Sequence, residues 1–143
     1  MSQSVIDELN TFLEGNYMAI HAYDQYIHHM DDDMIKRQLQ QIQQQHKQHA
    51  ALIAERIQNL GGKPVHDVGM MGNMAEFMQQ MKSTTDREHI LKDALVGEQR
   101  GIKTSQELME QDLDQESLQL VESILNRDRE HVTLLQNLLK KPH

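Results

Sequence analysis

Residues 46–64 read HKQHAALIAERIQNLGGKP, and this stretch decides the fold. It completes an apolar stripe over residues 35–60 whose members recur in steps of three and four, which is the spacing of one face of an α-helix. Gly61 and Gly62 follow, and then Pro64. Glycine adopts the left-handed cap of a helix and proline cannot continue one, so the sequence predicts a helix that ends at the two glycines.

Three further stretches show the same periodicity. The sequence therefore predicts four helices, near residues 4–30, 34–60, 86–110 and 115–139. Residues 65–85 contain glycines and the methionines between Met70 and Met81, with room for a short helix at about 74–81 but for no long one. Two antiparallel hairpins joined by such a crossover form an all-α, ferritin-like four-helix bundle.

Composition limits the class of protein. A chain of 143 residues has room for one domain, 1–143, and 3% aromatic residues argue against an all-β fold. It has no apolar stretch of the ~20 residues that a membrane span needs and no basic, apolar leader, so we expect a cytoplasmic protein with no membrane partner. The net charge of −8 argues against nucleic-acid binding. Because there is no cysteine, any metal must be bound by His, Asp or Glu.

Polar residues interrupt the apolar stripes at mid-helix positions: Asn16, His46, His49, Glu98, Asp128 and His131. A buried imidazole or carboxylate without a partner is costly, so these groups should neutralise one another or share a cation. The steps of three, from His46 to His49 and from Asp128 to His131, place both members of each pair on one helix face. A separate partner for each group, such as Arg56 for one of the acids, is the alternative, but it must explain every coincidence separately. We therefore predict a metal site with the ligands His46, His49, Glu98, Asp128 and His131.

These motifs resemble the ferritin-like superfamily, and in particular bacterioferritin and rubrerythrin. Residues 46–64 are similar to the second-helix motif of that superfamily, in which an acid-x-x-His step precedes an Ala and an Arg-Ile, Leu, Gly, Pro ending. Residues 118–139 resemble its fourth helix, with the acid-x-x-His step at Asp128 and His131. The resemblance covers nearly the whole chain and implies a di-iron carboxylate site in the bundle.

The ligand set departs from that of the resembled family, which has four carboxylates and two histidines. Glu98 fills the lone-acid position of the third helix and Tyr23 fills the tyrosine position of the first. Asn16 and His46, however, replace glutamates, and Asp128 is shorter than the usual Glu. Two carboxylates balance one divalent ion, so we expect one tightly held ion, with a second bound weakly or only with bridging hydroxide. Three imidazoles and two carboxylates suit iron, with manganese or zinc as alternatives.

Other family features are missing from the sequence. Lys47 stands where bacterioferritins carry their haem-ligating Met, so haem is not expected, and no CxxC pair follows the bundle. Only a short tail follows Leu139, which leaves no fifth helix of the kind that helps to close 24-subunit cages. A homodimer is therefore the expected assembly.

The resemblance implies Fe(II) oxidation or peroxide reduction in stress defence, with Tyr23 as a proton or electron partner. Two alternatives remain at this point. One is a metal-stabilised structural or interaction module without redox turnover, and the other is an iron store like that of the mini-ferritins.

Overall fold

The computed structural model describes residues 2–67 and 86–141, and in these ranges the chain forms four helices and no strand. They are α1 (Ser2–His29), α2 (Asp33–Asn59), α4 (Arg87–Met109) and α5 (Gln115–Lys140). The predicted all-α, ferritin-like bundle is confirmed, and each predicted helix end lies close to the observed one. The short helix predicted at about 74–81, with most of the crossover, lies outside the described residues.

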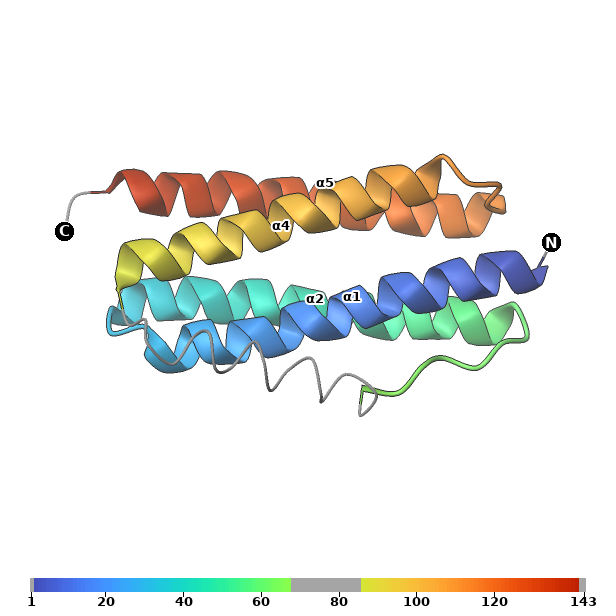
Figure 1. Cartoon of the computed structure of the whole chain (residues 1–143), viewed down its shortest axis with the longest axis horizontal. Coiled ribbons are helices and arrows are strands. Elements are labelled where there is room, and N and C mark those ends of the chain that lie inside the picture. Colours follow the sequence, from blue (N-terminus) through green and yellow to red (C-terminus); the bar gives the residue numbers. More distant parts are fainter. Residues whose placement is uncertain (1, 68–85, 142–143) are drawn as a thin grey trace.

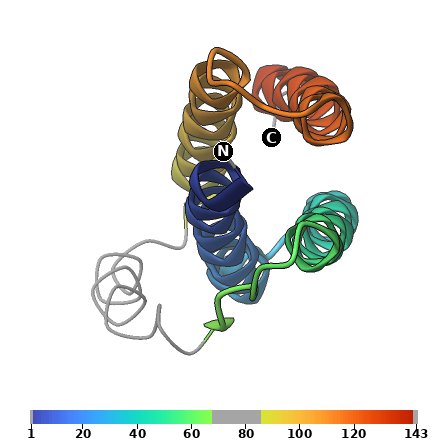
Figure 2. The same cartoon turned by 90° about the vertical axis from the view of Figure 1, so that its right-hand side faces the viewer.

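The helices pack as two antiparallel hairpins, one of α1 and α2 and one of α4 and α5 (Figure 1). The hairpins meet where α1 packs against α4 and α2 against α5, as the end view shows (Figure 2). Each short turn is followed by a capping aspartate, because a carboxylate accepts a hydrogen bond from an unpaired N–H of the first turn. Asp32 Oδ1 accepts from the Ile35 N–H at 3.0 Å, and Asp114 Oδ2 accepts from the Ser117 N–H at 3.1 Å.

The second helix ends where the glycines predict. Gly61 has φ +91°, and the Gly62 N–H donates to the Ile57 carbonyl oxygen at 2.9 Å. The chain then runs along α1, where Asn10 Oδ1 accepts from the Val65 N–H at 2.8 Å (Figure 1). Among the described residues, no helix is both long and apolar enough to cross a lipid bilayer.

The core of the bundle is divided in two. One apolar cluster surrounds the end with the α1–α2 turn: Tyr23, Tyr26, Met30, Ile35, Leu39, Ile42, Ile90, Leu91, Ala94, Leu135 and Leu138. The other surrounds the end with the α4–α5 turn: Val5, Ile6, Leu9, Phe12, Leu13, Ala50, Ile53, Ile57, Leu108, Val121 and Ile124. Between them lie six of the buried polar residues, which we call the polar layer: Asn16, His46, His49, Glu98, Asp128 and His131. The fold thus holds these six side chains away from water.

Two glycine substitutions should have opposite effects on stability. The Gly61→Ala substitution should lower the free energy of unfolding by about 1 kcal/mol, because φ +91° is unfavourable for a residue with a Cβ. Gly15 lies inside α1, and a Cβ added there meets no atom within 4 Å. The Gly15→Ala control should raise the free energy of unfolding by roughly 0.5–1 kcal/mol, since alanine is the better helix former. Urea unfolding followed by circular dichroism would measure both, and equal effects would contradict the expected cap.

Candidate metal centre

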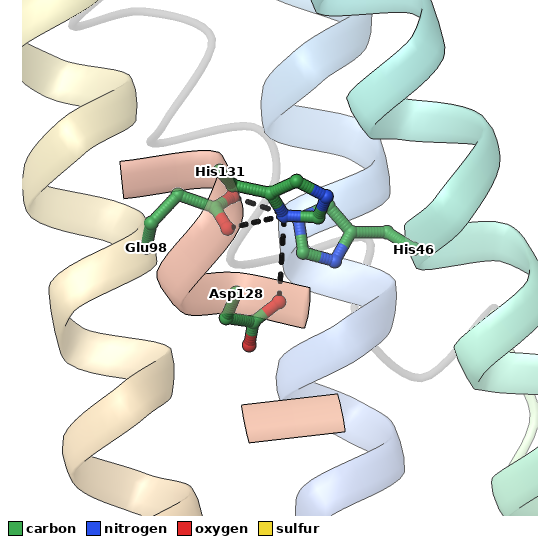
Figure 3. A group of neighbouring side chains, drawn as sticks. All are labelled: His46, Glu98, Asp128 and His131. Atoms are coloured by element: carbon green, nitrogen blue, oxygen red, sulfur yellow. Dashed lines mark hydrogen bonds and ion pairs between the residues drawn. The ribbon is translucent and has the colours of Figure 1, made fainter. Parts of the chain in front are cut away.

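Four side chains of the polar layer converge at its centre: His46 from α2, Glu98 from α4, and Asp128 and His131 from α5 (Figure 3). All four residues are buried, and one ligand atom from each lies within 4.8 Å of the others. Imidazole nitrogens and carboxylate oxygens together are the donor set for iron, manganese or zinc. We call these four residues the central group.

Glu98 holds the central group together. The Tyr23 hydroxyl donates a hydrogen bond to Glu98 Oε2 at 2.7 Å, and Nε2 of His46 lies 2.7 Å from the same oxygen. The other oxygen, Oε1, lies 2.9 Å from Nδ1 of His131. A carboxylate accepts hydrogen bonds but does not donate them, so both ring nitrogens carry protons here. A metal ion could bind to these nitrogens only after those protons had left.

The charges in the central group depend on one another. Burial by itself would raise the pKa of Glu98, but the hydrogen bonds from His131 and His46 outweigh it and lower that pKa to about 2. Burial would likewise lower the pKa of His131, but Asp128 and Glu98 raise it to about 9. At neutral pH Glu98 is therefore an anion and His131 a cation.

Asp128 is the incompletely satisfied member. Its Oδ1 atom is buried and makes no hydrogen bond; it forms an ion pair with Nδ1 of His131 at 3.5 Å, a nitrogen whose hydrogen bond goes to Glu98. Burial raises the pKa of Asp128, and the nearby Glu98 charge adds to this effect. A buried carboxylate oxygen without a hydrogen bond is costly, and an ion pair at 3.5 Å offsets this cost only in part, whereas a metal ion beside the oxygen would remove it. The residues therefore fit a metal ion.

Two residues of the polar layer do not join the central group. His49 is buried with its ring centroid 6.0 Å from that of His46, and its Nδ1 atom has no hydrogen-bond partner. Burial, and then the neighbouring His46 and His131, lower the pKa of His49 to about 4, so it is neutral. Asn16 donates from Nδ2 to the Phe12 carbonyl oxygen of its own helix at 3.2 Å. Both predicted residues thus line the site without lying among its donor atoms.

Sequence reasoning missed two glutamines of α2. Gln45 Oε1 accepts a hydrogen bond from Nε2 of His131, which keeps a proton on Nε2 and points Nδ1 at the carboxylates. Gln43 is buried and donates to Asp24 Oδ1 at 2.6 Å, which ties α2 to α1. Both glutamines flank the apolar stripe at helical spacing. Their position beside the stripe was the one feature of the sequence that could have distinguished them from the other glutamines of this stretch.

The environments of Tyr23 and Arg56 are well defined in the structure. The Tyr23 side chain is almost completely buried, and burial, with the Glu98 charge, raises its pKa well above its ordinary value. Its hydroxyl therefore stays neutral. Arg56 pairs with Asp114 at 3.0 Å and Glu116 at 2.6 Å, at the end of the bundle. It does not neutralise the acids of the central group, so the pairing of Arg56 with one of those acids is wrong.

Comparison with known protein families shows to which family the chain belongs. Residues 4–111 match the family described as a domain of unknown function, DUF2383. The chain belongs to this family. A search of curated proteins gave no significant match.

Solved structures show what the fold of this DUF2383 chain is similar to. A two-domain protein of Anabaena variabilis with DJ-1/ThiJ/PfpI-like and ferritin-like domains is 19% identical with a TM-score of 0.80; the alignment covers 98% of this chain and 40% of that one. The DUF2383 chain thus spans less than half of that protein. The dodecameric thioferritin of Bacteroides fragilis is 23% identical with a TM-score of 0.79, over 97% of this chain and 86% of that one.

The bacterioferritin of Desulfovibrio desulfuricans, whose structure contains a di-iron site, is 22% identical with a TM-score of 0.73, over 96% of this chain and 79% of that one. These likenesses confirm the ferritin-like fold of the DUF2383 chain.

Loss of the Gln45 side-chain amide should weaken metal binding without removing a ligand. In the Gln45→Ala variant the His131 ring would lose the partner of its Nε2 atom, and such outer contacts typically contribute 10–100-fold to metal affinity. The exposed Gln44 of the same helix provides the control, Gln44→Ala. Competition titration against a chelator would measure both affinities. Equal affinities would show that Gln45 does not position His131.

The metal-free protein should lose stability in mild acid because of His49. The pKa of His49 is about 4 in the folded protein and 6.5 in its ordinary state, so between these values the unfolded chain binds a proton that the folded chain does not. The free energy of unfolding should therefore fall as pH drops from 6.5 toward 4, by up to about 3 kcal/mol. His131, with its raised pKa, acts in another window, since its contribution is complete below 6.5 and is lost toward pH 9.

Urea unfolding at a series of pH values, with chelator present, would measure this dependence. The His49→Leu variant should lose the part that lies between pH 6.5 and 4. An unchanged slope in that variant would contradict the assignment to His49.

Proposed function

We propose that this chain binds one divalent metal ion, iron in the first place, through His46, Glu98, Asp128 and His131. The observation that carries the proposal is Oδ1 of Asp128, a buried carboxylate oxygen without a hydrogen-bond partner in a group that is otherwise paired. The convergence of four donors from three helices supports it.

The charge of the central group favours one ion over two. Its two carboxylates balance a single divalent cation, and the other two donors are imidazoles. His49 and Asn16 lie outside the group and add no negative charge. A second ion would bring two uncompensated positive charges into a buried layer, which is strongly unfavourable.

Each residue then has a definite task. Glu98 and Asp128 supply the compensating charge, and His46 and His131 give up the protons that now face Glu98. Gln45 orients His131, while Tyr23 orients Glu98 by its hydrogen bond. An iron ion bound there would supply the one-electron redox chemistry that a ferroxidase or a peroxide-reducing centre needs. We propose that role in stress defence as the activity of the chain.

A second candidate function is a structural role for the metal without redox turnover. It is favoured by the origin of the donors, because His46 belongs to the α1–α2 hairpin and the other three belong to the α4–α5 hairpin. An ion at this point would join the two hairpins. Aerobic Fe(II) oxidation, followed optically with and without protein, distinguishes the two, since only the redox centre speeds it.

Metal content should saturate near one ion per chain. Elemental analysis after loading with Fe(II) under anaerobic conditions, or with Zn(II), would measure it. The Glu98→Gln variant should lose tight binding, because one of the two compensating charges is gone. The Glu107→Gln variant removes an exposed acid from the same helix and should still bind one ion. Equal binding in the two variants would contradict the site.

The number of carboxylates in the polar layer should set how many ions it binds. Replacing Asn16 and His46 together by glutamate would give the layer four carboxylates, so capacity should rise toward two ions and Fe(II) oxidation should become faster. Tight binding of two ions by the unaltered chain would show that water-derived bridges or other carboxylates supply the missing charge.

We also propose a homodimer as the assembly. The dodecameric state of the thioferritin relative belongs to that protein, and sedimentation velocity would show which state this chain adopts. A dodecamer would favour the alternative of an iron store.

A further inference from the structure

A cavity of about 360 Å³ lies between α1 and α4, which run side by side (Figures 1 and 2). We call it the α1–α4 groove. Its lining reaches from exposed residues to the central group, of which His46, Glu98 and Asp128 contribute to it. Small-molecule sites in proteins typically measure ~300–1,000 Å³, so this space is large enough for an organic ligand.

The groove is open because small residues line both helices. They are Gly15, Ala19 and Ala22 on α1, and Ala94, Gly97 and Gly101 on α4. A Cβ added at Gly15 or Gly97 would meet no atom within 4 Å, so neither glycine is required for close helix packing. Each costs its helix about 1 kcal/mol relative to alanine. The space that they leave is not filled by neighbouring side chains of the described residues.

The groove is apolar near its entrance and polar at its inner end. Met18 of α1 and Val96 of α4 line it and are 43% and 50% exposed. At the inner end, Asp128 is 5% exposed, and its Oδ2 atom lies 3.5 Å from the position of a Cβ added at the groove residue Gly101. Tyr23 also lines the groove, but its hydroxyl already donates to Glu98. No side chain of the described residues donates a hydrogen bond to Oδ2 of Asp128, so this oxygen is an acceptor open to a donor from a ligand.

We propose that the α1–α4 groove binds a small amphiphilic molecule with an apolar body and a neutral hydroxyl head. The body contacts Met18, Val96 and the alanines, and the hydroxyl donates to Oδ2 of Asp128, which leaves Oδ1 for the metal ion. The neutrality of the head rests on the proposed function, because one divalent ion already balances the two carboxylates and a charged head would disturb that balance. The site thereby acquires a class of organic ligand in addition to its metal.

A series of 1-alkanols from ethanol to 1-octanol provides the probe. Calorimetric titration should give saturable binding of one alkanol per chain, with affinity rising roughly fourfold for each added methylene that the groove buries. The titration is run on metal-free and on Zn(II)-loaded protein. Neutral alkanols should bind to both forms, whereas hexylammonium should bind only to the metal-free form.

Variants at the groove give the decisive comparison. Gly97→Leu and, on the facing helix, Gly15→Leu place a side chain in the open space and should reduce 1-hexanol affinity at least tenfold. The exposed Gln99 of α4 does not line the groove, so Gln99→Leu adds the same side chain elsewhere and should leave the affinity unchanged. Circular dichroism checks that all three variants fold. If one of the two groove variants does not fold, the other still tests the groove.

The outcomes separate this inference from the proposed metal site. Groove variants that lose alkanol binding but still bind one Zn(II) ion would support the inference. Absence of saturable alkanol binding to the unaltered protein would overturn it. A groove filled by another part of this chain, or by a second copy, would give the same result. Equal binding by Gly97→Leu, Gly15→Leu and Gln99→Leu would also overturn it. If Zn(II) does not bind at all, the proposed function fails, while the alkanol titration still tests the groove.

Discussion

The carboxylate of Glu98 is the contact on which the rest of the structure depends. Its two oxygens take hydrogen bonds from Tyr23 of α1, His46 of α2 and His131 of α5, so the side chain from α4 touches all three other described helices. A buried anion is tolerated only when its lone pairs are satisfied. The four helices must therefore keep one register and one set of rotations about their axes. The apolar clusters on either side supply the driving force for packing but do not specify that register by themselves.

Much of this arrangement follows from the sequence. The helices follow from steps of three and four, and the end of α2 follows from Gly61 and Gly62. The buried polar positions follow from the same periodicity, because a helix face is fixed once its apolar members are known. Residues as distant along the chain as His46 and His131 can therefore be assigned to one layer from periodicity alone.

Periodicity does not give the direction of a side chain within that layer. His46 and His49 share a face, yet only His46 reaches Glu98, because the rotamer and the level along the bundle decide which ring arrives there. Gln45 was missed for the same reason, since its partner is on another helix.

The division of the core has a consequence for how the bundle opens. Because the two apolar clusters share no buried residue, either end can lose its packing while the other keeps its own, which makes the two ends candidates for separate cooperative units. The polar layer lies between them. A cation held there would join the units, so that amide hydrogen exchange at both ends would slow together when it binds. A cation bound in the polar layer would in this way make the two ends of the bundle unfold as one cooperative unit.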